Sequence, residues 1–87
     1  MSTIKKMEER LQALAPENME ILDESGKHVG HEGAKGGGGH YHLVIVSPRF
    51  CGQPTLARHR MVYDALGDLL RKDIHALAIR ALTPNEF

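Results

Sequence analysis

The sequence predicts an α/β (α+β) domain in which the elements follow the order α-β-β-α-β. Three observations support this prediction: 87 residues of which 41% are hydrophobic, two segments with apolar residues at helical spacing, and strand-like runs between and after them. A chain of this size builds one two-layer core and no second domain. We therefore expect a three-stranded mixed sheet covered by helices on one face, with the other face open to solvent.

The first helix carries its apolar residues in a single stripe. These residues are Ile4, Met7, Leu11 and Leu14. Their spacing of three and four residues is typical of an amphipathic helix, and Pro16 ends it. The apolar and polar residues of the segment 19–22 then predict a short half-buried strand, which the turn cluster at 23–26 terminates.

Residues 26–39 contain most of the nine glycines of the chain, together with His28 and His31. Glycine loses the most backbone entropy on ordering, and this segment offers little apolar surface to bury. We expect a flexible Gly/His-rich loop here, longer than an ordinary hairpin loop, inside a single domain that spans residues 1–87. A long loop in so small a domain is either a disordered connection or a binding element.

The second half of the chain predicts a strand-helix-strand unit. The β-branched run 40–47 is the clearest strand, the turn 48–54 follows it, and residues 74–79 form a third strand. Because the connection is a crossover, the last two strands are parallel. We expect Thr55 to cap the intervening helix, and Thr83 and Glu86 to form a capping box that begins a short C-terminal helix.

The intervening helix is expected to bury one broad apolar face. The residues assigned to that face are Leu56, Val62, Tyr63, Ala65, Leu66, Leu69 and Leu70. Because these positions recur at helical spacing, we expect all of them to pack against the sheet.

The composition excludes several classes of function. Residues 48–72 are locally basic, but eleven basic and eleven acidic side chains give the whole chain no net charge, so the basic segment is only a modest signal for binding to nucleic acid. The longest apolar run, 43–46, is far too short to cross a membrane, so we expect a cytoplasmic protein. The single cysteine, Cys51, cannot form an internal disulfide, and no residue is placed to orient His59 as its base. We expect no enzymatic activity.

Six histidines are the compositional outlier, because imidazole is the commonest metal ligand in proteins. His40 and His42 lie two residues apart on one strand and should share a face. Together with His28 and His31 they offer a candidate zinc site, against the simpler interpretation of exposed polar residues. His75 interrupts an apolar alternation near the start of the third strand, which by itself favours a hydrogen-bonded core histidine.

Three sequence segments together resemble the BolA family. They are the turn "VSPRFCG" at 46–52, the triplet "RHR" at 58–60, and the strand "IHAL" at 74–77. The resemblance runs from about residue 3 to the end and implies a fold similar to the class II KH domain. The Gly-x-x-Gly signature of KH domains is absent after the turn, so clamping of single-stranded nucleic acid is not implied.

The resemblance implies two activities. Members of the family form heterodimers with monothiol glutaredoxins and share a bridging [2Fe–2S] cluster, for which glutathione and the glutaredoxin supply sulfur. The invariant histidine ligand falls on His75, and the loop ligand falls on His28, with His31 as the second choice. Cys51 does not occupy a ligand position.

The second implied activity is transcriptional regulation in stress and morphology, with DNA contacts at the start of the second helix. The residues that would carry it are Arg49, Arg58, His59, Arg60 and Lys72. Hydrogen bonds within the fold are an equal explanation for the triplet at 58–60. Duplex DNA is therefore a further candidate partner beside the glutaredoxin. A second copy of the chain is another candidate partner.

Overall fold

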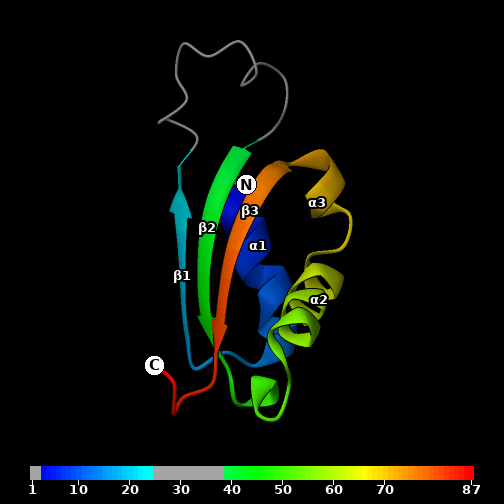
Figure 1. The fold of residues 1–87 in the computed structure, drawn as a ribbon. Helices are drawn as coiled ribbons and strands as arrows, with labels where there is room; N and C mark the ends of the chain where they lie inside the picture. Colours follow the sequence, from blue (N-terminus) through cyan, green and yellow to red (C-terminus); the bar gives the residue numbers. More distant parts are fainter. Residues whose placement is uncertain (1–2, 25–38) are drawn as a thin grey trace.

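The computed structural model describes residues 3–24 and 39–87 of the chain (Figure 1). The elements are the helix α1 (Thr3–Leu11), the 3-10 turn η1 (Gln12–Leu14), the strands β1 (Asn18–Asp23) and β2 (Gly39–Val46), the 3-10 turn η4 (Pro48–Phe50), the helices α2 (Thr55–Leu66) and α3 (Leu69–Lys72), and the strand β3 (Ile74–Leu82). The predicted order is confirmed. The predicted loop at 26–39 lies outside the described residues, except for Gly39, which begins β2.

The three strands form one mixed sheet in the order β1-β2-β3. β1 pairs with β2 in antiparallel fashion, from Asn18 opposite Val46 to Asp23 opposite Tyr41. β2 pairs with β3 in parallel, and α2 and α3 form the crossover between them. The starts of β2 and β3 therefore meet at one end of the sheet, and their ends meet at the other.

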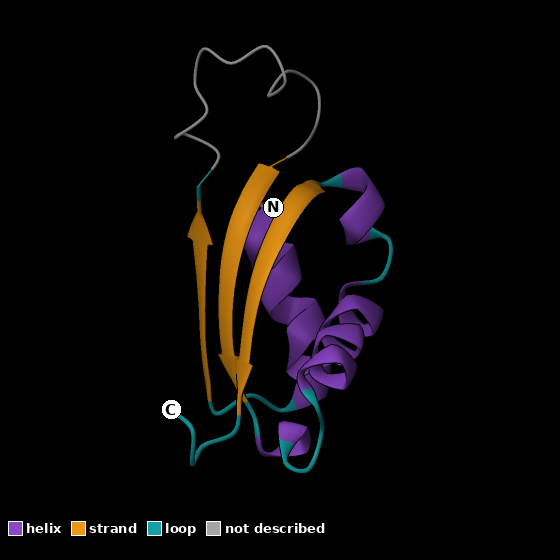
Figure 2. Ribbon diagram, in the orientation of Figure 1, coloured by secondary structure: helices purple, strands orange, loops and turns teal. Residues whose placement is uncertain are grey.

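The helices cover only one face of the sheet (Figure 2). The core between the two layers contains Met7 and Leu11 of α1, Leu43 and Ile45 of β2, and Phe50. Val62 and Leu66 of α2 complete it from the other helix. The predicted two-layer packing is confirmed, and the opposite face of the sheet carries no helix in the part of the chain that is described.

The predicted helix over 55–70 is wrong in two respects. Leu56 and Tyr63 are 71% and 43% exposed, because they lie seven residues apart on a face that turns away from Val62 and Leu66. The helix also breaks at Gly67, whose φ of 58° is accessible mainly to glycine. The break allows Leu69 to be buried from the separate helix α3.

The ends of the predicted helices also differ from the sequence prediction. Thr55 is the first residue of α2 and not its cap; Pro54 takes the cap position, and no side chain caps the helix. The C-terminal helix is replaced by a single turn, in which the Glu86 N–H donates to the Thr83 carbonyl at 3.0 Å. The carboxylate of Glu86 accepts from the Thr83 N–H at 2.8 Å, so half of the capping box forms without a helix following it.

None of the helices in the described part of the chain is long and apolar enough to span a lipid bilayer.

Candidate functional site

His75 is exposed at the start of β3 because the strand contains a bulge. Gly39 pairs with Ile74 and His40 pairs with Ala76, so β3 has one residue more than β2 at this point, and that residue is His75. Ile74 is buried while His75 and Ala76 are both exposed. A bulge redirects a side chain in this way. The core-histidine interpretation, which assumed regular alternation with Leu77, is therefore wrong.

A second imidazole lies beside His75. The ring of His40, at the start of β2, has its centroid 5.0 Å from that of His75, with an angle of 40° between the ring planes. The two residues are 35 positions apart in the sequence, and parallel pairing of β2 and β3 brings them together. Sequence reasoning considered His40 as a member of the candidate zinc set or as an exposed polar residue and did not pair it with His75, although two histidines near the starts of two parallel strands were a signal that could have done so.

The segment that carries His28 and His31 is attached at this same end of the sheet. Those two residues lie outside the described part, but the residues flanking the segment are described. The N–H of Glu24, just after β1, donates to the His40 carbonyl at 2.8 Å. The N–H of Gly39, at the start of β2, donates to the Asp73 carbonyl at 3.1 Å. Both attachment points of residues 25–38 thus lie next to His75 and His40.

Gly39 is required for close packing at this end. A Cβ at this position would lie 2.5 Å from Cε2 and 2.6 Å from the hydroxyl of Tyr41. The Tyr41 side chain is nearly buried in the core, so it cannot move without disturbing the packing beneath it. The glycine that ends the predicted loop therefore has a local structural role at the start of β2.

The described residues offer an incomplete set of metal ligands. Within 3–24 and 39–87, no three side chains of His, Cys, Asp or Glu are placed to hold one metal ion together. His40 and His42 share one face of β2 as predicted, but the other two members of the candidate zinc set, His28 and His31, lie outside the described residues. Among the described residues, the exposed His75 is therefore a single available imidazole and not part of a complete metal site.

Arg58, one of the predicted DNA contacts, is used by the fold. Its Nε donates to the Gln53 carbonyl at 2.8 Å, and its Nη1 donates to the Ala81 carbonyl at 3.0 Å. Nη1 and Nη2 also donate to the Glu86 carboxylate at 2.6 Å and 3.3 Å. These bonds join the turn before α2, the end of β3 and the C-terminal turn, and we call them the Arg58 latch.

The latch shifts the pKa values of both ionised partners. The hydrogen bonds from Arg58, with a further one from the Thr83 N–H, lower the pKa of Glu86 to about 2. The same hydrogen bond to Glu86 raises the pKa of Arg58 above its usual value. Both groups therefore remain charged at neutral pH, and the guanidinium is directed toward the protein.

The turn before α2 is also held by buried contacts. Ser47 is buried, and its Oγ donates to the Leu14 carbonyl at 2.6 Å while accepting from the Arg49 N–H at 3.1 Å. Phe50 is completely buried in the core. The "VSPRFCG" segment thus has a structural role that accounts for its serine and its phenylalanine. Cys51 is exposed at the end of this turn.

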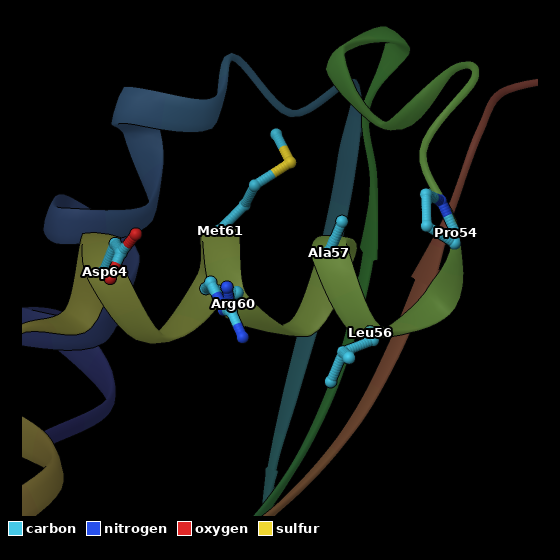
Figure 3. Close-up of a pocket in the computed structure, with 6 residues that line it drawn as sticks. All are labelled: Pro54, Leu56, Ala57, Arg60, Met61 and Asp64. Carbon is cyan, nitrogen blue, oxygen red and sulfur yellow. The ribbon is translucent and has the colours of Figure 1, made fainter.

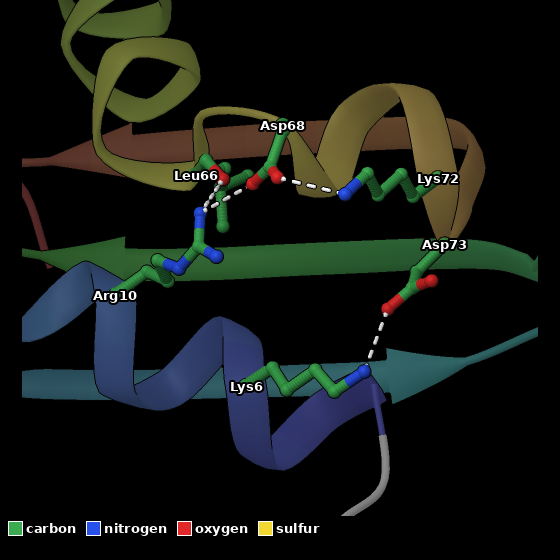
Figure 4. A network of polar contacts seen from close by, with 6 residues as sticks. All are labelled: Lys6, Arg10, Leu66, Asp68, Lys72 and Asp73. Atoms are coloured by element: carbon green, nitrogen blue, oxygen red, sulfur yellow. Dashed lines mark hydrogen bonds and ion pairs between the residues drawn. The ribbon is translucent and has the colours of Figure 1, made fainter.

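Lys72 belongs to a polar network between α1 and the α3 region (Figure 4). Its Nζ lies 3.3 Å from Oδ2 of Asp68. Arg10 donates to Oδ1 of Asp68 at 2.9 Å and to the Leu66 carbonyl at the end of α2 at 2.8 Å, and Lys6 pairs with Asp73 at 3.2 Å. Hydrogen bonds from Arg10 and Lys72 lower the pKa of Asp68. Lys72 is still 72% exposed, so it is only partly neutralised.

The remaining predicted DNA contacts are more available. Arg49 and Arg60 are exposed, and His59 is half-buried. Arg60 lines a shallow groove of about 330 Å³ on the outer side of α2 (Figure 3). The other lining residues are Pro54, Leu56, Ala57, Met61 and Asp64. The structure therefore divides the "RHR" triplet, because Arg58 holds the fold while Arg60 faces solvent beside an apolar groove.

Comparison with known proteins identifies the family. The model of the family described as BolA-like protein matches residues 11–86. The chain belongs to the BolA family. The BolA-like protein 1 of Mus musculus is 45% identical over 76 residues, which cover 87% of this chain and 53% of the mouse protein. The chain thus spans about half the length of that relative.

Two further BolA relatives differ in length and description. The DNA-binding transcriptional regulator BolA of Escherichia coli is 39% identical over 83 residues, which cover 94% of this chain and 76% of that protein. SufE-like protein 1 of Arabidopsis thaliana is 42% identical over 78 residues, which cover 84% of this chain and 21% of that protein. The solved BolA domain of SufE1 superposes with a TM-score of 0.84 and 40% identity, covering 100% of this chain and 98% of that domain. The α+β fold is therefore that of BolA domains.

Proposed function

We propose that the chain is a non-enzymatic adaptor that binds a monothiol glutaredoxin and helps to hold a bridging [2Fe–2S] cluster in iron–sulfur or iron homeostasis. The observation that carries this proposal is the exposed imidazole of His75, which the bulge in β3 directs out of the sheet. A core histidine with both nitrogens occupied would have excluded it. Family membership supports the proposal, since the family resemblance assigns this role to the His75 position.

The second ligand on this chain is His28, with His31 as the second choice. His28 is four residues beyond Glu24, whose N–H binds the His40 carbonyl. Four residues span at most about 14 Å, which allows a histidine at this position to approach His75. The cluster, when bound, supplies a one-electron redox centre whose potential depends on its ligands, and imidazole ligation raises that potential relative to thiolate.

Residues beside the ligand have positioning roles. The His40 ring, 5.0 Å from that of His75, restricts the directions in which the His75 ring can point. Gly39 and the buried Tyr41 fix the start of β2 on the other side. In this proposal the chain binds the cluster through His75, whose imidazole these neighbours hold in place, and through the loop histidine, while the glutaredoxin and glutathione provide the sulfur ligands.

Anaerobic reconstitution of the chain with a monothiol glutaredoxin, iron, sulfide and glutathione tests this proposal. We expect visible circular dichroism of the wild-type pair to differ from that of the glutaredoxin homodimer, and His75→Ala to abolish the difference. His42→Ala, which removes an imidazole from the adjacent part of the same sheet, is the matched control and should retain the wild-type spectrum. An unchanged spectrum for His75→Ala would contradict the ligand assignment.

His28→Ala and His31→Ala, studied in the same way, distinguish the two loop histidines. We expect His28→Ala to alter the spectrum and His31→Ala to leave it unchanged. The reverse result would transfer the second ligand to His31. Native mass spectrometry of the isolated chain with added zinc tests the alternative four-histidine site: a stoichiometric zinc adduct lost on His42→Ala would favour zinc over the shared cluster.

DNA-binding regulation is the second candidate function. It is supported by the exposed guanidinium groups of Arg49 and Arg60 and by the description of the E. coli relative as a DNA-binding transcriptional regulator. We expect affinity for duplex DNA to fall steeply as salt rises, and Arg60→Ala to weaken it and to reduce the salt slope. Arg71→Ala, an exposed arginine outside the predicted set, is the control. Equal affinity of the wild-type chain, Arg60→Ala and Arg71→Ala for duplex DNA would exclude a DNA interface at Arg60.

A further inference from the structure

The uncovered face of the sheet has a regular composition. It is formed by even-numbered residues of the three strands, except Val46 and Ile74, which are buried, whereas the odd-numbered residues of β1 and β2 face the helices. The members of this open face, as we call it, are Glu20, Leu22, His40, His42, Val44, Ala76, Ala78, Arg80 and Leu82. Leu22 is 47% exposed, so the face has unburied apolar surface.

Opposite charges flank the centre of the open face. The strand register places Glu20 of β1 beside Val44 of β2, and Val44 beside Arg80 of β3. Glu20 and Arg80 are thus two strand spacings apart, about 10 Å, and neither side chain forms an ion pair or hydrogen bond with another described residue. The three residues line a hollow of about 450 Å³ together with Leu82, Glu86 and Phe87.

The next row of residues is asymmetric in size. Leu22 of β1, His42 of β2 and Ala78 of β3 lie side by side across the sheet. A large apolar side chain therefore lies at one edge of the row and a small one at the other. If a second copy of the sheet faces the first with its two edges interchanged, each row meets its complement. Glu20 then faces Arg80, and the large Leu22 faces the small Ala78.

A two-fold axis that runs along β2, above Val44, performs this exchange. It keeps each position along the strands and interchanges the two edges of the sheet. Arg80 of one copy then lies over Glu20 of the other, in both directions, and Leu22 lies over Ala78. A two-fold axis across the strands would instead place Glu20 over Glu20 and Arg80 over Arg80, which repel each other. Aligned packing of two sheets allows the first arrangement.

We propose that the open face binds a second copy of the chain in a two-fold dimer, through two intermolecular Glu20–Arg80 ion pairs on either side of Val44. The interface is isologous, as a two-fold dimer requires. A three-stranded face lies at or below the low end of specific interfaces, well under about 800 Å² per copy. The dimer is therefore expected to be weak.

Sedimentation velocity over concentrations from about 10 μM to about 1 mM, the range in which weak dimers form, tests for this dimer. We expect the wild-type chain to change from monomer to dimer. Glu20→Arg and Arg80→Glu should each remain monomeric, because each creates like-charged contacts across the axis. The double variant carrying both reversals should dimerise again, with the wild-type dissociation constant within about three-fold.

An equimolar mixture of the two single variants is the most specific test. One copy then carries two arginines and the other two glutamates, so both contacts across the axis become attractive and a heterodimer forms although neither variant dimerises alone. Arg71→Glu and Glu9→Arg, exposed reversals away from the open face, are controls that should leave the wild-type equilibrium unchanged. Far-UV circular dichroism verifies that all variants are folded.

Two results would overturn the proposal. A wild-type chain that is monomeric throughout the concentration range has no such interface. A dimer that persists in the folded Arg80→Glu variant, or fails to form in the mixture of single variants, uses a different surface or a different partner orientation.

Discussion

At one end of the sheet, polar side chains form hydrogen bonds within the protein, whereas at the other end the imidazole of His75 is exposed. Where β2 and β3 end, Arg58 donates to two carbonyl groups and to the Glu86 carboxylate, and Ser47 is buried with both of its bonds made inside the protein. Where the same strands begin, His75 is exposed on a bulge, with His40 beside it. The first end secures the fold, and the second end presents an exposed imidazole.

This difference separates residues that look alike in the sequence. The "RHR" triplet and the "IHAL" strand are equally recognisable as motifs, yet the first arginine of the triplet is consumed by hydrogen bonds within the chain. The number of internal partners that a side chain has in the fold distinguishes a structural role from an available one. By that criterion Arg58 is structural, whereas His75 and Arg60 are available to partners.

Substitution of Phe50 by Ala should have the largest effect on stability, because it creates a cavity at the latch end. Phe50 is completely buried, and truncation of a buried phenylalanine costs about 3–5 kcal/mol. Urea unfolding followed by circular dichroism measures the loss. Arg49→Ala, at the exposed neighbouring position, should change stability by less than about 0.5 kcal/mol. Equal losses in the two variants would contradict the role assigned to this end.

Substitution of Gly39 by Ala tests a tightly packed position at the end of the sheet where His75 and His40 lie. The added Cβ overlaps the Tyr41 ring, and overpacking of this kind costs about 1–3 kcal/mol. We expect lower stability and a shift of the Tyr41 ring resonances in NMR spectra. Gly52→Ala, where no atom lies within 4 Å of the added Cβ although φ is 78°, controls for backbone strain alone. An unperturbed Tyr41 in Gly39→Ala would contradict the close approach.

Substitution of Glu86 by Gln should remove a pH-dependent contribution from the latch. The folded pKa of Glu86 is lowered to about 2 from 4.5, so the carboxylate stabilises the fold above pH 4.5 and this contribution is lost as pH falls toward 2. The wild-type chain should be more stable than Glu86→Gln at pH 7, and the difference should disappear near pH 2. Denaturant midpoints at several pH values measure it. A constant difference across this range would refute the ion pair.

Substitution of His75 by Ala should have the smallest effect on stability, even though it has the largest expected effect on cluster binding. The side chain is exposed, so its removal should change the free energy of unfolding by less than about 0.5 kcal/mol. Thermal unfolding of the isolated chain checks this, with Ile74→Ala, the buried neighbour, as a destabilised comparison. A large loss in His75→Ala would show that the imidazole belongs to the fold after all.

The local sequence was sufficient to predict most of the helices and strands, but it did not predict correctly which face of the second helix is buried. The stripes of α1 and the alternation in β1 and β2 follow from periodicity, because each buries one side against the same core. Leu56 and Tyr63 were wrongly assigned to the core because hydrophobicity alone does not fix the rotation of a helix. The break at Gly67 changes that rotation between Leu66 and Leu69.

Patterns within short segments and chain connectivity were enough to predict the order of elements, the parallel crossover and the two sets of candidate residues. Which of these candidates are available depended on contacts between segments that are distant in the chain. The bulge that exposes His75 exists because β2 and β3 pair with one unmatched residue, and Arg58 is consumed because Ala81 and Glu86, more than twenty residues away, meet its guanidinium. Both outcomes depend on contacts between distant segments, which form only when the whole domain folds.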